Sequence, residues 1–394
     1  MLFLEPRENL MLKLYQSCIP DVTGSIEEEL RQCLEKAFNT QKTGMMPLRF
    51  EVFADLPDFE SVILTRELVL KAITGLFGTK VPAFNVSAHP PARPWKIAVE
   101  ACFTGQPVIT SYRKYEDFNY AVAEQNGIRE IWAAGLSSYS YKENTRTAAI
   151  EAFEKLVGLL KNEGMSPDNI IRQWNYIGNI LSMQNGLQNY QIFNEVRSEY
   201  YGKYRTLSSF PAATGVGMKH GGVILDCVAC DSKDTASIKP VDNPNQVNAY
   251  NYSQQVLKGN TEHGKNRKHP PQFERALLVN NSSGTTLYIS GTASIIGQET
   301  IGRGNTVEQT YVTIENINKL ADPEHVSSVL ATGKACRVRY SAVRVYVKNQ
   351  KDFEDAVKIC SRHYSGVPSV FIEADICRDD LLIEIEAEGE VTTW

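Results

Sequence analysis

The stretch VPSVFIEADICRDDLLIEIEA, residues 367–387, decides how the C-terminal part of the chain folds. Its first apolar run stops at a charged turn and continues as LLIEIEA, which predicts two strands joined as a hairpin. Because successive strand residues point to opposite faces, Leu382, Glu384 and Glu386 share one face of the second strand. The two carboxylates either form a solvated edge or include a working group in a pocket.

Two earlier stretches have the same layout, VPAFNVSAHPPARPWKIAVEA at 81–101 and the run at 210–230. Each has a proline at its second position, then a strand of small residues, a polar turn and an apolar second strand. In this alignment Glu384 stands opposite Ala98 and Cys227. A shared structural role would leave similar residues in all copies. A carboxylate in one copy alone therefore indicates that one of three equivalent pockets has a catalytic role. The alternative is drift on a surface strand.

Ahead of each stretch the apolar spacing predicts a helix, a strand and a second helix. In the segment 145–164, for example, Ala149, Phe153, Leu156 and Leu160 recur at helical spacing. The predicted helices cover 25–38, 59–77, 145–164, 189–204, 306–321 and 352–366, and the predicted strands cover 49–54, 171–180 and 339–347. The sequence therefore predicts an α/β (α+β) chain of three strand–helix–strand–helix–hairpin units, related by a pseudo-threefold axis.

The boundaries of these units fall in polar stretches, and we expect the units to span 1–105, 106–231 and 273–394. Residues 232–272, between the second and third units, form a polar segment far longer than the usual connection in a compact domain. Tyr250 and Tyr252 argue against a disordered linker, because disordered segments are poor in aromatic residues. We expect a long loop that lies across the protein and contributes to a site.

Bulk composition excludes several classes of protein. In 394 residues the hydrophobic content of 42% and the charged content of 22% are ordinary for a soluble globular protein. A net charge of −5 argues against general binding to nucleic acid and against attraction to membranes. No apolar run approaches the roughly 20 residues of a membrane span, and the opening MLFLEPRENLMLKLYQ has charges where a signal peptide needs an apolar core.

The eight cysteines show no spacing typical of a disulfide framework, which favours reduced thiols and a cytoplasmic location. The one CxxC motif, Cys227 to Cys230, lies in a predicted strand with no second pair and no nearby histidine. We interpret it as two core cysteines and not as a zinc or redox site. No metal cluster, phosphate loop or Ser/His/Asp arrangement is present in the pattern, so neither a metal nor a cofactor is expected.

The predicted unit resembles the RidA (YjgF) fold, whose members are trimers of small α/β subunits with clefts between neighbours. The chain as a whole resembles the chorismatases, enzymes that hydrolyse chorismate and carry this architecture in one long chain. The stretches that match extend from about residue 80 to the C-terminal end, and SGTASIIG together with CRDDLLIEIE is the most specific pair. They are WNYIGNI (174–180), FPAATGVG (210–217), NPNQVNAYNYS (243–253), PPQFERA (270–276), LYISGTASIIGQET (287–300), RVYV (344–347) and CRDDLLIEIEA (377–387).

Two departures from the chorismatase pattern concern the substrate side of the expected site. Where the family has a Gly-His-Glu-Ser run after SGTASI, this chain has Gly-Gln-Glu-Thr, with Gln298 in the place of the histidine. A compact Tyr-Gly-Pro-Arg element expected before PPQFERA is replaced by KGNTEHGKNRKH at 258–269.

The resemblance implies roles for particular residues. Glu384 falls on the catalytic glutamate, and Arg275 in PPQFERA falls on an arginine that would bind a substrate carboxylate. Arg344, which aligns with Trp174 of the second unit, is the second candidate for a carboxylate. The remaining candidates are a hydroxyl donor and two small residues that let substrate approach the strand closely, namely Tyr250, Gly291 and Ala293. The alternatives are a solvated strand start for Arg275 and a stacking residue that anchors the loop for Tyr250.

Cys377 lies seven residues before Glu384. In chorismatases, a cysteine at this place accompanies the aromatising branch, which yields hydroxybenzoate and pyruvate, whereas an alanine accompanies hydrolysis to a dihydroxycyclohexadiene acid. The resemblance thus favours 3-hydroxybenzoate as the product, and a buried turn cysteine is the alternative. Glu386, whose counterpart Glu100 lies in a unit taken as inert, is expected to be dispensable.

A second class of function comes from the RidA fold itself, whose members include enamine/imine deaminases and non-catalytic ligand-binding proteins. The deaminases need an arginine near the start of the last pair of strands, and here Pro368 and Ser369 stand at that place. Their presence in place of an arginine weighs against deaminase activity. The expected partner is a small molecule, chorismate. Because one chain holds three units that can close a ring, we expect a monomer.

Overall fold

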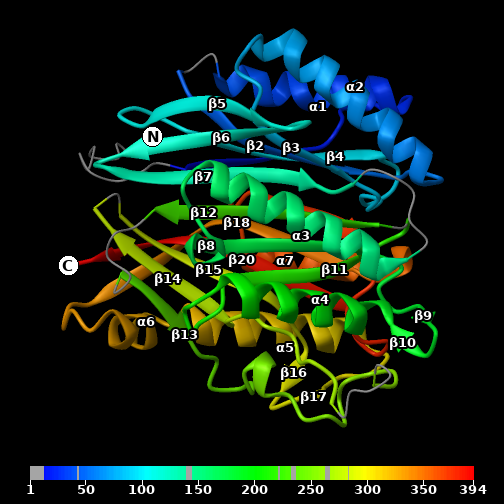
Figure 1. Cartoon of the computed structure of the whole chain (residues 1–394), viewed down its shortest axis with the longest axis vertical. Coiled ribbons are helices and arrows are strands. Elements are labelled where there is room, and N and C mark those ends of the chain that lie inside the picture. Colours follow the sequence, from blue (N-terminus) through cyan, green and yellow to red (C-terminus); the bar gives the residue numbers. More distant parts are fainter. Residues whose placement is uncertain are drawn as a thin grey trace.

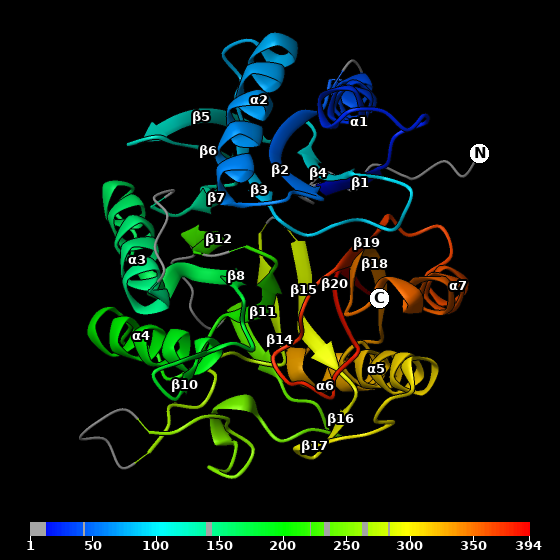
Figure 2. The same ribbon diagram turned by 90° about the vertical axis from the view of Figure 1, so that its right-hand side faces the viewer.

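The computed structural model describes residues 13–41, 44–138, 144–220, 222–231, 237–261, 267–282 and 284–394. Within these residues the chain forms three main sheets whose inner faces meet at the centre of the molecule, while the helices lie outside (Figures 1 and 2). Figure 2 shows α1 and α2 over the first sheet, α3 and α4 over the second, and α5 and α7 over the third. The predicted mixed α/β chain of three units is confirmed.

The first unit forms a four-stranded sheet in the order β1-β4-β2-β3. Its helix α2 begins after Asp58, whose side chain accepts a hydrogen bond from the Ser61 amide, and ends at Gly78. The elements are β1 (Lys13–Cys18), α1 (Ile26–Gln41), β2 (Met46–Ala54), α2 (Phe59–Phe77), β3 (Ala83–Ser87) and β4 (Ile97–Thr104).

The second unit forms a six-stranded sheet in the order β11-β8-β12-β7-β6-β5. The elements are β5 (Ile109–Tyr115), β6 (Phe118–Gln125), β7 (Ile128–Leu136), α3 (Thr145–Asn162), β8 (Ile170–Gly178), β9 (Met183–Gln184), β10 (Leu187–Gln188), α4 (Asn189–Tyr204), β11 (Ala212–Met218) and β12 (Val223–Asp231).

The third unit forms a six-stranded sheet in the order β13-β14-β15-β20-β18-β19. Its edge strand β13 lies within the segment 232–272, so that segment is not one continuous loop as predicted. The elements are β13 (Ile238–Val241), β14 (Ala276–Asn281), β15 (Gly284–Ala293), β16 (Ile295–Ile296), β17 (Glu299–Thr300), α5 (Thr306–Leu320), α6 (Pro323–Leu330), β18 (Cys336–Val347), α7 (Phe353–His363), β19 (Ser369–Glu373) and β20 (Ile383–Thr393).

The predicted hairpin at the end of each unit is wrong. In the third unit β19 and β20 do not pair with each other; β19 pairs parallel to β18, and β20 pairs antiparallel to the other side of β18. The same arrangement places β2 between β3 and β4, and β8 between β11 and β12. Alternation of apolar and polar residues is the same whichever neighbour a strand has, so the pattern could not distinguish these pairings. The connection 374–382 passes the end of β18, where Ala374 and Lys348 donate backbone hydrogen bonds to Val347 and Leu382.

The alignment of the three units needs one correction. Glu384 of β20 pairs with Tyr346 of β18, and Ala98 of β4 pairs with Phe53 of β2. Glu384 and Ala98 are therefore equivalent. In the second unit the residue opposite Tyr176 is Ile224 and not the predicted Cys227. Because the two positions differ by an odd number of residues, Cys227 points to the opposite face and packs under the helices.

Four buried clusters explain the layering. One cluster draws side chains from all three sheets and includes Trp132, Trp174, Tyr288 and Tyr346. Each of the other three clusters lies between one sheet and its own helices. The three sheets therefore share one central core, and each inter-sheet cleft is built by two units.

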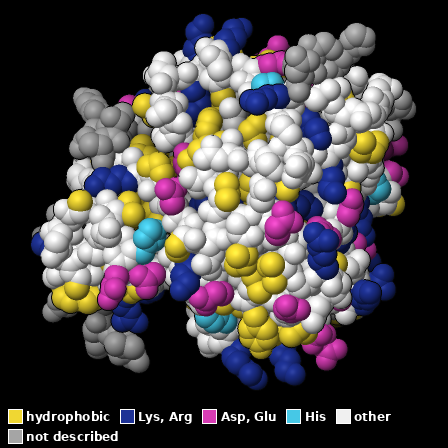
Figure 3. Space-filling view, turned by 90° about the horizontal axis from the view of Figure 1, so that it is seen from below, with side chains coloured by type: hydrophobic (Ala, Val, Ile, Leu, Met, Phe, Trp, Pro, Cys, Tyr) yellow, Lys and Arg dark blue, Asp and Glu magenta, His cyan; other side chains and the backbone are white. Residues whose placement is uncertain are grey.

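The outer surface carries mixed charges on the face that Figure 3 shows, where basic and acidic side chains alternate with scattered hydrophobic ones. This face has no contiguous basic stripe of the kind that nucleic acids bind. None of the described helices combines the length and the apolar character that crossing a membrane requires.

Candidate active site

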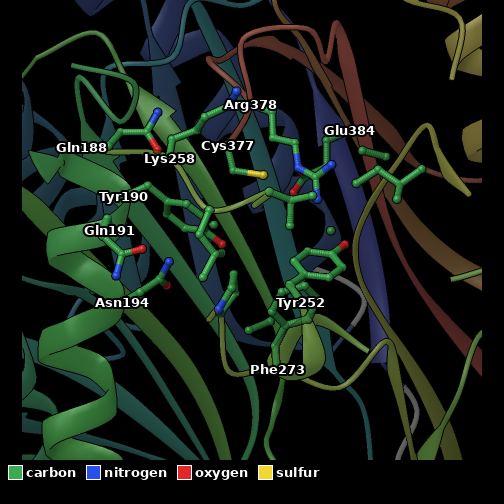
Figure 4. Close-up of a pocket in the computed structure, with 18 of the residues that line it drawn as sticks. Gln188, Tyr190, Gln191, Asn194, Tyr252, Lys258, Phe273, Cys377, Arg378 and Glu384 are labelled. Carbon is green, nitrogen blue, oxygen red and sulfur yellow. The ribbon is translucent and has the colours of Figure 1, made fainter. Parts of the chain in front are cut away.

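A pocket lies between the second and the third sheets, as Figure 4 shows. It has about 710 Å³ of empty space, part of which is open to solvent. One wall comes from α4 and β11, and the opposite wall comes from β15, β20 and the connection 374–382. The remaining side is lined by residues on either side of the undescribed positions 262–266, namely Tyr252, Val256, Leu257, Lys258, Pro271 and Phe273.

Glu384 projects from β20 into this pocket and is 5% exposed. Burial, and after it the negative charge of Glu386, raise the pKa of its carboxyl to about 8 against the opposing effect of Arg172 and Arg275. No hydrogen bond to the Glu384 carboxyl is found among the residues that the structure describes. A carboxylic acid that keeps its proton near neutral pH can act as a general acid.

The lack of a side chain at Gly291 leaves the space that the Glu384 carboxyl occupies. A Cβ atom at residue 291 would lie 2.0 Å from Glu384 Oε1 and 3.0 Å from the Thr214 methyl carbon, so no larger residue fits without movement. The pairing of β15 with β20 shifts register between Ile289 and Thr292, which is a β-bulge at this point. The bulge and the missing side chain let the Glu384 carboxyl lie directly against the strand.

Glu386 projects from the same face of β20 but has a different environment. Trp174 Nε1 donates a hydrogen bond to its Oε1 at 2.7 Å, and Arg172 Nη2 lies 2.9 Å from its Oε2. Arg344 Nη1 lies 3.3 Å from Oε1. Burial opposes ionisation, but the two arginines outweigh it and hold the pKa of Glu386 at about 2. Glu386 is a buried structural anion, and the small effect of its substitution on activity stays a prediction.

Arg275 reaches the pocket from the segment just before β14 and is 3% exposed, which excludes the solvated strand start. Its Nη2 donates to the Tyr252 hydroxyl at 2.8 Å and to the Val247 carbonyl. Its Nε is buried and has no hydrogen-bond partner in the described structure. No carboxylate of the described residues forms an ion pair with Arg275, so this buried cation is left for an anionic ligand.

Cys377 and Arg378 come from the connection 374–382 and line the pocket next to Glu384. Burial raises the pKa of the Cys377 thiol to about 12, and the nearby Glu384 adds to the effect. The thiol is therefore neutral at physiological pH and is not an activated nucleophile. Figure 4 shows Cys377 between the α4 side chains and the Tyr252 side of the pocket.

Two predicted substrate-binding residues lie outside this pocket. Arg344 is 1% exposed in the central core, where it pairs with Glu100 at 2.6 Å and with Glu386. Tyr250 hydrogen-bonds Glu274 at 3.3 Å and packs on Phe210 with ring centroids 5.4 Å apart. Tyr250 thus anchors the loop, which is the alternative that its position left open. The predicted Glu384, Cys377, Arg275, Gly291 and Ala293 do lie together.

The sequence patterns missed several residues of the pocket. Helix α4 and the residue before it present the carboxamides of Gln188, Gln191 and Asn194, together with Tyr190. The spacing of three residues between the carboxamides places them on one helix face and could have indicated a polar wall. Tyr252, two residues after the predicted Tyr250, supplies the hydroxyl at the site. Lys258 and Arg378 were also missed, and residues 262–266 of the divergent stretch 258–269 lie outside the described residues.

The equivalent cleft between the third and the first sheets has no acid at the corresponding place. Ala98, which is equivalent to Glu384, lines that cleft together with Pro368 and Ser369. Of these two clefts, as far as the described residues show, the one between the second and third sheets has the buried carboxylic acid at this place.

The described residues contain no group of three or more His, Cys, Asp and Glu side chains that could hold a metal ion. Cys227 packs on the helix side of β12, and Cys230 packs in the central core, so the two thiols of the CxxC motif lie on opposite faces. This agrees with the interpretation as core cysteines.

Comparisons with known proteins point to one family. The sequence pattern described as "Chorismatase FkbO/Hyg5-like, N-terminal" matches residues 110–229. A protein of Streptomyces hygroscopicus named 3-hydroxybenzoate synthase is 32% identical over 253 residues, which cover 62% of this chain and 69% of that protein. A chorismatase of Streptomyces rapamycinicus is 29% identical over 223 residues, covering 55% of this chain and 63% of that protein, less than two thirds of its length.

The fold agrees with this relationship over nearly the whole chain. The crystal structure of a chorismatase superposes with a TM-score of 0.65 at 19% sequence identity, covering 96% of this chain and 99% of the other. At that identity the superposition shows a shared fold. Together with the identity of 32% to a relative matched over more than two thirds of its length, these findings show that the chain belongs to the chorismatase family.

Proposed function

We propose that this protein is a chorismatase that uses Glu384 to protonate the enol ether of chorismate and so releases pyruvate. The observation that carries the proposal is the Glu384 carboxyl, buried without a hydrogen bond in the described pocket and with a pKa of about 8. Its relatives named chorismatase and 3-hydroxybenzoate synthase support the choice of substrate.

The substrate sets three chemical requirements. Chorismate is a dianion whose enol ether must receive a proton on its methylene carbon. That step needs an acid that is still protonated near neutral pH, which burial of Glu384 supplies. The two carboxylates need cationic partners, preferably the bidentate fork of arginine, and Arg275 is buried with an unpaired Nε in the same pocket.

The reaction begins when the Glu384 proton moves to the methylene carbon and the electron pair of the double bond forms the new C–H bond. The resulting oxocarbenium ion is positive, and the newly formed Glu384 carboxylate stabilises it across the pocket. If water adds to the side-chain carbon of this ion, the resulting hemiketal breaks its bond to the ring oxygen, the ring keeps that oxygen as a hydroxyl, and the water oxygen becomes the keto oxygen of pyruvate. If the substrate's own hydroxyl attacks the ring carbon, the bond between the ring and the ether oxygen breaks, and the ether oxygen becomes the keto oxygen of pyruvate. The three-carbon unit leaves as pyruvate.

The second product depends on what attacks next. Attack by water gives a dihydroxycyclohexadiene carboxylate and consumes one water molecule. Attack by the substrate's own hydroxyl, followed by loss of a ring proton, gives a hydroxybenzoate with no net consumption of water. Cys377 lines the pocket seven residues before Glu384, and this supports the hydroxybenzoate branch with 3-hydroxybenzoate as the product.

The test is incubation of the purified protein with chorismate, followed by assay of pyruvate and identification of the ring product by mass and retention time. We expect pyruvate and 3-hydroxybenzoate in equal amounts. Glu384→Gln keeps the shape of the side chain but removes its proton, so pyruvate release should fall about 10²–10⁴-fold or more. Absence of pyruvate from the unaltered protein, or full activity of Glu384→Gln, would overturn the proposal.

A further inference from the structure

Arg378 has no assigned role in the reaction, yet its guanidinium lines the pocket. Its Nη1 donates to the backbone carbonyl of Gln298 at 2.7 Å, and its Cζ lies 5.1 Å from the centre of the Tyr252 ring. Its Nη2 is buried and has no hydrogen-bond partner within the described parts of the chain. A buried guanidinium N–H without a partner costs free energy unless a ligand satisfies it.

The same tyrosine ring also contacts Arg275. The Cζ atom of Arg275 lies 5.6 Å from the ring centre, and its Nη2 donates to the Tyr252 hydroxyl at 2.8 Å. Tyr252 therefore fixes two arginines at once, one through its hydroxyl and both through its ring. The two guanidinium carbons are at most 10.7 Å apart, the sum of 5.1 and 5.6 Å.

We propose that Arg378 is the second carboxylate-binding residue of the pocket, and that the Arg275–Tyr252–Arg378 cluster selects a small ligand carrying two carboxylates. This inference deepens the proposed function and rests on it for the identity of the natural ligand. Arg275 and Arg378 each keep one buried N–H free, and neither forms an ion pair with a carboxylate of the described residues. Each can therefore receive one carboxylate.

The charge balance of the pocket favours a dianion over a monoanion. The charged side chains that line it are Lys258, Arg275, Arg378 and Glu384. Glu384 keeps its proton at neutral pH, so the lining carries three positive charges and no compensating negative one. A ligand with one carboxylate would leave one of the two guanidinium groups unpaired.

Lys258 is a weaker candidate for the second carboxylate. Its side chain is exposed, so an ion pair there is screened by solvent. The unpaired Nη2 of Arg378 is buried, and a charge-assisted hydrogen bond at that place is stronger.

Gln298 positions Arg378. Its backbone carbonyl accepts a hydrogen bond from Arg378 Nη1, and its side-chain Oε1 accepts one from the Ser253 amide at 3.2 Å, next to Tyr252. One residue thus ties the arginine and the loop that carries the tyrosine. Gln298 stands where the chorismatase pattern has a histidine, so this link accompanies a departure of this chain from the pattern.

The experiment compares benzoate with benzene-1,3-dicarboxylate as ligands in titration calorimetry, using the intact chain. We expect the dicarboxylate to bind the unaltered protein at least tenfold more tightly than benzoate. Arg378→Gln should lose about 10–100-fold in affinity for the dicarboxylate and little for benzoate, which removes the preference. Arg303→Gln is the matched control, because Arg303 is exposed, pairs with Asp380 at 3.1 Å and does not line the pocket.

Retention of the preference in Arg378→Gln would overturn the inference. If that variant does not fold, Arg378→Lys keeps the charge but loses the fork, and it should bind the dicarboxylate at least several-fold more weakly than the unaltered protein. The result is separable from the proposed function. A dicarboxylate preference that depends on Arg378 supports the inference even if chorismate is not turned over, whereas turnover with an unchanged KM in Arg378→Gln counts against it.

Discussion

Glu384 and Glu386 project from the same face of β20, two residues apart, and their pKa values are shifted in opposite directions. Burial raises the pKa of Glu384 to about 8, and its carboxyl forms no ion pair with a cation of the described residues. Glu386 is equally buried but lies against Arg344 and Arg172, which hold its pKa at about 2. The ionised Glu386 increases the difference between the two pKa values, because its negative charge makes ionisation of Glu384 harder. The pair separates a structural anion from a candidate acid on one strand.

The pH dependence of the rate should follow Glu384. The reaction needs its protonated form, and the substrate carboxylates stay ionised across the range, so kcat/KM should be level near pH 6–7. Above pH 8 it should fall toward tenfold per pH unit, as the group loses its proton. The measurement is initial pyruvate release between pH 5.5 and 10 at constant ionic strength. A rate that rises through pH 8 would identify a base in place of an acid.

The same pKa values predict how stability changes with pH. The folded pKa of Glu384 is raised above its unfolded value, so the folded state binds more protons between about pH 4.5 and 8 and stability falls as pH rises through that window. Glu384→Gln cannot titrate, so its melting temperature relative to the unaltered protein should increase from pH 5 to pH 8.5. Calorimetric scans at several pH values measure this.

Glu386→Gln provides the contrasting control for that series. The folded pKa of Glu386 is depressed, so its stabilisation is present above about pH 4.5 and is lost as pH falls toward 2. The variant leaves Arg344 and Arg172 without their buried partner and should lose about 3–5 kcal/mol at neutral pH. Equal effects of the two substitutions at pH 7 would contradict the assignment of roles.

Gly291→Ala should damage activity more than stability. The added Cβ would collide with the Glu384 carboxyl, which must move, and a displacement of about 1 Å costs on the order of 10²-fold in rate. Gly202→Ala in α4 is the matched control, since nothing lies within 4 Å of a Cβ there. Pyruvate release and thermal melting should be measured for both. Wild-type activity in Gly291→Ala would show that Glu384 is not held against the strand during the reaction.

Cys377→Ala should change the product and leave the total rate of pyruvate release within a few-fold of the unaltered protein. Both branches share the protonation by Glu384, and the thiol, neutral because burial raises its pKa to about 12, only shapes the place where the intermediate is attacked. We expect dihydroxycyclohexadiene carboxylate to increase relative to 3-hydroxybenzoate, as resolved by chromatography. Cys360→Ala, buried in the third unit's helix-side core, should not alter the ratio. An unchanged ratio in Cys377→Ala would leave the thiol without a role in product choice.

The sequence predicted the helices well apart from α6, which it missed, because their apolar periodicity is local. The segments 59–77 and 189–204 coincide with α2 and α4. Strand pairing was predicted poorly, since alternation fixes the faces of a strand but not its neighbours. For the same reason Glu384 and Glu386 were placed correctly on one face, whereas the hairpin with β19 was wrong.

The site was predicted only as far as the family pattern reached. The pattern identified Glu384, Arg275, Cys377, Gly291 and Ala293, which lie in the pocket. Arg344 and Tyr250 were misplaced, because a buried arginine paired with carboxylates and an arginine awaiting a ligand look alike in a sequence. Burial and the identity of the partner distinguish them, and both are tertiary properties.

The last prediction concerns assembly. The three sheets of one chain enclose a single central core, with side chains from all three in the same cluster. Contacts between β3 and β7, β11 and β15, and β1 and β19 already close the three inter-unit clefts within one molecule. In the described parts of the chain each unit already contacts the other two, and we therefore expect a monomer of 44.1 kDa in solution. Light scattering coupled to size-exclusion chromatography, over a tenfold range of concentration, measures the mass directly. A stable mass near three chains would mean that surfaces outside these clefts associate, and the site would then have to be sought again at the interface between chains.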